Sequence, residues 1–125
     1  EPEPLLVPRL RLYYIYQSYS INQVMPFFQQ VPFGKIEKNR DLVLFGAGKV
    51  GKSFYKQLND ASYCKSITWV DNNHKLYEME NVKPPEILYR IQYDNILIAV
   101  NDENAKEEIT AWLKRIGVPD NKIIR

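Results

Sequence analysis

Three glycines in the middle of the chain have the spacing of a phosphate-binding turn. Gly46, Gly48 and Gly51 match the pattern G-x-G-x-x-G of dinucleotide-binding proteins. The first glycine allows a sharp bend, the second lets the main chain approach a diphosphate, and the third lets helix and strand pack closely. The N–H groups and the dipole at the start of the next helix attract the anion. The candidate cofactor-binding residues of this turn are Gly46, Ala47, Gly48, Lys49, Val50 and Gly51.

An acidic residue follows at the distance that such a turn requires. Asp71 lies twenty residues after Gly51, at the end of the next predicted strand, where a carboxylate can accept hydrogen bonds from ribose hydroxyls. Asn72 could contact the ribose or a base edge, although we favour a simple turn there. Asn101 follows a third strand and could face the ligand, although capping of the next helix by Asn101 or Asp102 is the favoured interpretation. We expect this site to bind NAD(H) or a nucleotide-sugar.

The same loop also fits a second phosphate-binding pattern. Read from Gly46 to Ser53 as G-x-x-x-x-G-K-[ST], it resembles the phosphate loop of NTPases. Lys52 would then reach the β- and γ-phosphates, and Ser53 would hold magnesium. The chain has no D-x-x-G or N-K-x-D motif, and only about 75 residues follow the loop. We therefore favour the dinucleotide interpretation, in which Lys52 and Ser53 are surface residues of a helix.

Strands and helices alternate around these residues, which predicts a parallel α/β sheet. Apolar runs typical of buried strands alternate with segments of helical spacing, and residues 72–83 are polar and irregular, with at most a short strand around Val82. The predicted strands cover 42–45, 66–70, 95–100 and 122–124, and the predicted helices cover 50–59, 84–89 and 103–116. The fold class is Rossmann-like: an open parallel sheet of about four to five strands with helices on both faces.

The first forty residues differ in composition from the rest. Residues 1–40 hold five of the eight prolines and seven aromatic residues, so any helix there must be short, near 9–19 and 20–25. We assign 1–40 to an aromatic-rich helical extension or linker and 41–125 to the nucleotide-binding domain. Exposed aromatic side chains favour a contact with another domain of a longer parent chain, or with a second copy in a homodimer.

The composition excludes several classes of protein. The 125 residues carry a net charge of +2, too small to indicate nucleic-acid binding, and no apolar run is long enough for a membrane helix. One cysteine, Cys64, fits a reducing, cytoplasmic setting. One histidine, His74, excludes a multi-histidine zinc site, and we expect no metal site. Neither Cys64 nor His74 has an identifiable catalytic partner, so we predict no catalytic residue.

The domain resembles a known group of proteins over residues 31–125. It is similar to small Rossmann-like domains of bacterial surface-polysaccharide biosynthesis, which are appended to family 2 glycosyltransferases, sugar-modifying enzymes and methyltransferases. It is also similar to the amino-terminal domains of nucleotide-sugar dehydratases and sugar acyltransferases. The segments that carry the resemblance are 32–36, 41–51, 69–73 and 93–100. The Tyr-x-x-x-Lys dyad of short-chain dehydrogenases and sugar epimerases is absent, as is a second nucleotide-binding half.

This resemblance implies an accessory role. We expect a nucleotide-binding domain, without chemistry of its own, in a larger bacterial enzyme of cell-surface polysaccharide synthesis, with a glycosyltransferase as the favoured parent. One alternative is the cofactor-binding fragment of an NAD-dependent nucleotide-sugar oxidoreductase or epimerase. Two others are an interaction module that lost its ligand and a phosphate-loop NTPase.

Overall fold

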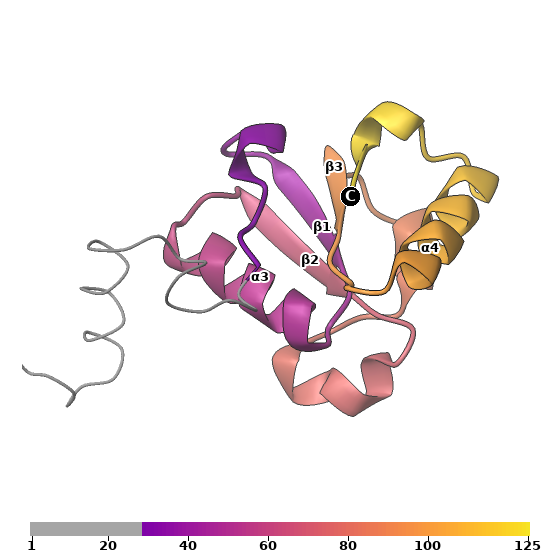
Figure 1. Cartoon of the computed structure of the whole chain (residues 1–125), viewed down its shortest axis with the longest axis horizontal. Helices are drawn as coiled ribbons and strands as arrows, with labels where there is room; N and C mark the ends of the chain where they lie inside the picture. The colour runs from indigo at the N-terminus through magenta and orange to yellow at the C-terminus, as the bar shows by residue number, and fades with distance from the viewer. Residues whose placement is uncertain (1–28) are drawn as a thin grey trace, which may run out of the picture. The chain divides into compact units, whose positions relative to one another are not determined.

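Within residues 29–125, which the structure describes, four parallel strands form one sheet in the order β2-β1-β3-β4 (Figure 1). The computed structural model describes residues 29–125, so the helices expected near 9–19 and 20–25, and the homodimer contact expected from that aromatic segment, lie outside the described residues. The strands are β1 (Asp41–Phe45), β2 (Ser66–Val70), β3 (Asn95–Ile98) and β4 (Ile123–Ile124). All three strand pairings are parallel, which confirms the predicted fold class.

The central strand β1 buries both of its faces. Its side chains alternate between the two sides of the sheet, as the period of a strand requires. Leu42 and Leu44 belong to the apolar cluster that contains the buried residues of α3, whereas Val43 and Phe45 belong to the cluster that contains the buried residue of α4. The two α-helices among the described residues are α3 (Lys49–Asp60) and α4 (Glu103–Arg115). Helices therefore cover both faces, as predicted.

The ends of α4 follow from its sequence. Asp102 Oδ1 accepts a hydrogen bond from the Asn104 N–H at 3.1 Å. Of the two predicted caps, Asn101 and Asp102, it is therefore Asp102 that caps the helix. Glu103 lies in the first turn and Lys114 and Arg115 lie in the last, which suits the helix dipole at both ends. Because Asp102 follows β3 so closely, the start of α4 lies at the carboxyl edge of the sheet.

The segment after β2 has more regular structure than its sequence indicates. Residues expected to be irregular form the 3-10 helix η2 (His74–Glu80), and a second 3-10 helix, η3 (Pro85–Tyr89), follows at the predicted place. Short 3-10 turns need no apolar repeat, which explains why the pattern of η2 was missed. Lys83 forms an isolated parallel bridge with Val70, next to the short strand expected around Val82.

A short segment before β1 packs against the domain. The compact unit runs from Val31 to Arg125, so it begins ten residues before the boundary drawn from composition. Val31 and Ile36 are buried in the same cluster as α3. The Tyr63 hydroxyl can donate to the carbonyl oxygens of Ile36 at 2.6 Å and Phe33 at 3.1 Å. These contacts fasten the segment to the loop between α3 and β2.

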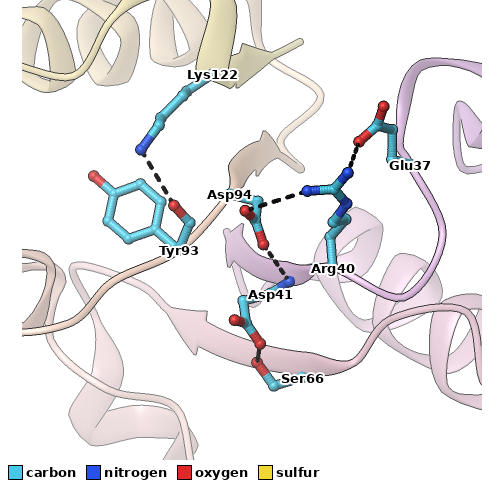
Figure 2. Close-up of polar contacts among 7 residues, drawn as sticks. All are labelled: Glu37, Arg40, Asp41, Ser66, Tyr93, Asp94 and Lys122. Atoms are coloured by element: carbon cyan, nitrogen blue, oxygen red, sulfur yellow. Dashed lines mark hydrogen bonds and ion pairs between the residues drawn. The ribbon is translucent and has the colours of Figure 1, made fainter.

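A polar network joins the amino ends of three strands (Figure 2). Asp94, just before β3, exchanges two bonds with Asp41: its Oδ2 accepts from the Asp41 N–H at 2.9 Å, and its N–H donates to the Asp41 carbonyl at 2.8 Å. The Ser66 hydroxyl donates to Asp41 Oδ1 at 2.7 Å. Arg40 lies 2.9 Å from Glu37 and 3.8 Å from Asp94. The network holds β1 in register with β2 and β3 at this edge.

Lys122 extends the same edge toward β4. Its Nζ donates to the Tyr93 carbonyl at 3.2 Å and lies 5.2 Å from the centre of the Tyr93 ring (Figure 2). Burial raises the pKa of the Tyr93 hydroxyl above its usual value. Tyr93 therefore stays neutral at physiological pH, and it acts here as a platform for the lysine.

The described residues contain neither a helix that could cross a membrane nor a cluster of metal-binding side chains. No helix within 29–125 has the length and apolar character needed to cross a bilayer. The same residues contain no group of three or more histidine, cysteine, aspartate or glutamate side chains that could hold a metal ion.

The edge network makes a prediction about stability. Asp94→Ala removes the acceptor of the Asp41 N–H and leaves Arg40 with one partner, so it should lower the free energy of unfolding by about 1–3 kcal/mol. Glu37→Ala removes only an exposed ion pair and should change it by less than about 1 kcal/mol. Urea unfolding followed by circular dichroism measures both. Equal effects of the two substitutions would contradict a structural role for Asp94.

Candidate functional site

The glycine turn lies where the order of the strands reverses. From β1 the chain passes through α3 to β2 on one side, whereas β3 pairs with β1 on the other side. Open α/β sheets bind their ligands at such a point, outside the carboxyl ends of the strands. Gly46 to Gly48 follow β1 and Ala99 to Asn101 follow β3, so both segments lie at the carboxyl ends of these neighbouring strands. The structure therefore brings Asn101 to the same edge as the glycines.

Two of the three glycines are required by the packing of the chain itself. Gly46 has φ +128°, and a Cβ there would collide with the carbonyl oxygen of Ala99. A Cβ on Gly51 would collide with the carbonyl oxygen of Gly46. The first glycine thus makes the bend and the third lets α3 approach the turn, as the sequence pattern predicted.

The middle glycine, Gly48, avoids no such collision. Gly48 has φ −79°, which any residue adopts, and among the described residues no heavy atom lies within 4 Å of a Cβ placed on it. Gly48 is exposed and is the N-cap of α3, whose first turn contains no acidic side chain. The main chain at the start of α3 therefore faces open space at the carboxyl edge of the sheet.

Three consecutive residues at the end of β2 hold the turn in place, and we name Trp69, Val70 and Asp71 the β2 clamp. The Trp69 indole N–H donates to the Gly46 carbonyl at 2.6 Å, and the Gly46 N–H donates to the Val70 carbonyl at 2.8 Å. The Ala47 N–H donates to Asp71 Oδ2 at 2.7 Å. Trp69 is buried, so its indole bond is shielded from water. The shape of the turn is thus set before any ligand binds.

Asp71 has a structural role that the sequence analysis did not assign. Besides Ala47, its carboxylate accepts from the Asn73 N–H at 2.7 Å, which closes the turn expected after β2. A carboxylate offers about four lone-pair sites, so each oxygen can accept one more bond, for example from a ribose hydroxyl. The ribose contact of Asp71 stays a prediction. The Asp-Asn-Asn run, typical of turns that bond their own main chain, is the signal that could have revealed this second role.

Lysine is the only charged residue type along the start of the helix. No acidic residue occurs between positions 42 and 59. Lys49 is exposed at the first residue of α3. Lys52 Nζ lies 4.9 Å from the centre of the Tyr77 ring, and Lys56 pairs with Asp60 at 2.9 Å. Lys49 is therefore the lysine best placed to meet an anion at the turn.

The geometry disfavours the phosphate-loop interpretation. Such a loop needs the residues between its first and last glycines to wrap the phosphates with free N–H groups. Here α3 already begins at Lys49, and the Ser53 hydroxyl accepts from Gln57 Nε2 at 3.0 Å. Lys52 and Ser53 therefore lie within the helix, as the dinucleotide interpretation expects.

The other predicted site residues contribute little side-chain surface. Ala47 and Gly51 are buried, and Val50 packs against the α3 cluster. These three residues can offer only main-chain groups, and the Ala47 N–H already bonds Asp71. Asn101 is exposed and has its own interactions within the structure.

A cavity open to solvent, which the sequence did not indicate, lies between the residue that follows Asp71, η3 and α4. It has a volume of about 270 Å³, and Asn72 contributes to its wall. Its other lining residues come from η3 and α4: Glu86, Ala105, Glu108, Ile109 and Trp112. No local motif connects these residues, because they lie on three elements separated in sequence. Trp112 is half-buried and forms part of the wall.

Cys64 and His74, the single cysteine and the single histidine of the chain, are each affected by burial. Burial raises the pKa of the Cys64 thiol, so little of it is thiolate at neutral pH. His74 Nδ1 is buried and has no hydrogen-bond partner among the described residues.

The glycines predict a contrast in stability. Gly51→Ala forces a Cβ against the Gly46 carbonyl and should lower the free energy of unfolding by more than about 2 kcal/mol. Gly48→Ala meets open space and should change it by less than about 1 kcal/mol. Thermal unfolding of the two variants measures the difference. A Gly48→Ala variant as unstable as Gly51→Ala would show that Gly48 serves the fold.

Most of the described domain matches a known family. A family model described as "C2185-like, N-terminal" matches residues 38–124, from just before β1 to the end of β4. The matched segment contains the glycine turn, the β2 clamp and the cavity. A search of the curated proteins found no match to the chain.

Proposed function

The chain belongs to the C2185-like N-terminal family, and we propose that its domain binds a nucleotide-type ligand, NAD(H) or a nucleotide-sugar, at the glycine turn. The ligand's phosphates would lie against the main chain of Gly48 and Lys49. Asp71 would accept hydrogen bonds from a ribose hydroxyl through its remaining lone pairs. Asn72 and Asn101 would border the ligand at the ends of β2 and β3.

The observation that carries this proposal is the open space at Gly48. Gly46 and Gly51 each avoid a collision with the chain, whereas a Cβ at the N-cap residue Gly48 would meet no heavy atom of the described residues within 4 Å. A glycine loses more conformational entropy on folding than any other residue. A glycine that avoids no collision within the chain therefore favours a ligand that requires one. A phosphate that approaches the main chain closely is such a need.

The surroundings of Gly48 suit an anion. The helix start adds the positive end of the dipole, and Lys49 adds a charge at the same place. Between Asp41 at the start of β1 and Asp60 at the end of α3, the chain has no carboxylate. The β2 clamp holds the turn rigid, so little ordering entropy would be lost on binding.

We infer binding without chemistry for this domain. Burial raises the pKa of the Cys64 thiol and so disfavours its thiolate, and His74 Nδ1 is buried without a hydrogen-bond partner among the described residues. The resemblance to domains appended to polysaccharide enzymes suggests that the ligand serves a larger bacterial transferase, with a glycosyltransferase as the favoured parent. In that role the domain would bind or sense a nucleotide for its parent.

A second candidate function is an interaction module that keeps the fold without a ligand. It is favoured by two apolar side chains of η2, Leu76 and Met79, which are 75% and 99% exposed. Apolar groups exposed to this degree suit a protein partner. This alternative predicts that substitutions at Gly48 leave the function of the domain unchanged.

Substitution of Gly48 tests the proposal. Gly48→Val fills the space where phosphate would approach, and we expect at least a tenfold loss of affinity for NAD and UDP-glucose in calorimetric titration. The control is Gly34→Val, because a Cβ on Gly34 also meets open space, but in the 3-10 helix η1 (Phe33–Lys35). Both variants should remain folded. Unchanged binding by Gly48→Val would exclude the turn as the site.

Asp71 should also set the choice between NAD and NADP. A 2′-phosphate held about 4 Å from its carboxylate would cost about 4 kcal/mol at an effective dielectric constant of 20. The wild-type chain should therefore bind NAD more tightly than NADP. Asp71→Asn keeps an acceptor for the Ala47 N–H but removes the negative charge. It should therefore reduce the difference between the affinities for NAD and NADP. Tighter wild-type binding of NADP, or no change in Asp71→Asn, would remove Asp71 from the site.

A further inference from the structure

The open cavity between Asn72, η3 and α4 has walls of two kinds, and its polar residues are exposed to solvent. Trp112 and Ile109 give it an apolar side, whereas Glu86 and Glu108 contribute carboxylates and Asn72 an amide. Among the described residues, no ion pair involves either glutamate, so both carboxylates can accept hydrogen bonds from a ligand.

The aromatic wall is braced by its neighbours. The Trp112 ring makes edge contacts with Phe45 and Tyr89, at centroid distances of 6.3 and 6.4 Å. Phe45 is the last residue of β1, so the tryptophan is tied to the strand that leads into the glycine turn. A planar base can stack on an aromatic side chain held in this way. The free energy of stacking depends little on which base it is.

The carboxylates add discrimination among bases. An ionised carboxylate only accepts hydrogen bonds, so it favours a ring that carries an amino group. Adenine offers two N–H donors on its exocyclic nitrogen. Uracil offers one N–H between two carbonyl oxygens, which the carboxylates would repel. Hypoxanthine has the purine shape of adenine with a carbonyl in place of the amino group.

The position and size of the cavity suit one part of a larger ligand. Asn72 directly follows Asp71, so the Cα atom of this lining residue lies about 3.8 Å from the Cα atom of the residue whose carboxylate holds Ala47. Whole-ligand pockets occupy about 300–1,000 Å³, and this cavity is smaller. Charge assigns the two ends: the carboxylates repel phosphate from the cavity, whereas Lys49 and the helix dipole attract it to the turn.

We infer that this cavity takes an adenine base, with Glu86 and Glu108 accepting from its amino group and Trp112 packing on the ring. The inference rests on the proposed function and narrows it from nucleotides in general to adenine nucleotides such as NAD. It makes Glu86 and Glu108 the residues that select the base.

Calorimetric titration of the full chain with ADP, IDP and UDP tests this assignment. IDP has a carbonyl oxygen and an N1–H where ADP has its amino group and an unprotonated N1. The carbonyl oxygen would face the two carboxylates, so ADP should bind about tenfold more tightly than IDP and UDP. In the double variant Glu86→Gln/Glu108→Gln, ADP should bind within about threefold of IDP. The matched control is Glu107→Gln, which makes the same change on α4 at a residue outside this cavity. It should leave the preference intact.

The outcomes separate this inference from the proposed function. Equal affinities for ADP, IDP and UDP, all lost in Gly48→Val, would overturn the base assignment and leave nucleotide binding at the turn. An ADP preference that the double variant keeps would also overturn it. No binding of any of the three diphosphates would overturn both. A preference that weakens in the double variant and survives in Glu107→Gln supports the assignment.

Discussion

The site depends on three bonds from consecutive residues of β2 to the glycine turn. Trp69 bonds the Gly46 carbonyl, Val70 bonds the Gly46 N–H, and Asp71 bonds the Ala47 N–H. A shift of β2 by one residue would move these groups to the opposite face and break the bonds. The turn is therefore as well defined as the β1–β2 register, and the polar network at the far end of β1 protects that same register. The β1–β2 register therefore determines both the fold of this region and the shape of the site.

The bonds from β2 to the turn explain why the glycines and the acidic residues have different roles. Gly46 and Gly51 let the turn fit against β3 and α3, which leaves Gly48 as the glycine that faces outward. Asp71 uses part of its carboxylate to hold the turn and keeps lone pairs for a ligand. Beyond it the charge changes sign, from the lysine at the start of α3 to the glutamates of the cavity. A bipolar ligand with phosphate at one end and an amino-bearing base at the other matches this arrangement.

The sequence predicted the parts of the structure that have a local pattern. Apolar runs revealed the strands, and Asp102 was one of two caps foreseen for α4. The G-x-G-x-x-G spacing revealed the turn, and the collisions avoided at Gly46 and Gly51 match its rationale. The bond from Trp69 could not be predicted, because a tryptophan in a buried strand reads as core packing alone. The cavity was missed because Trp112 and its neighbours meet only through the topology of the sheet.

The central claim is that the open side of the turn binds a nucleotide diphosphate. The most direct measurement is a nuclear magnetic resonance titration of the isotope-labelled full chain with ADP and, in parallel, with UDP, followed at the backbone amides. The account predicts that the largest shifts with either ligand occur at Gly48 and Lys49. Amides of the turn that do not move at millimolar ligand, or shifts confined to the region of Leu76 and Met79, would contradict it.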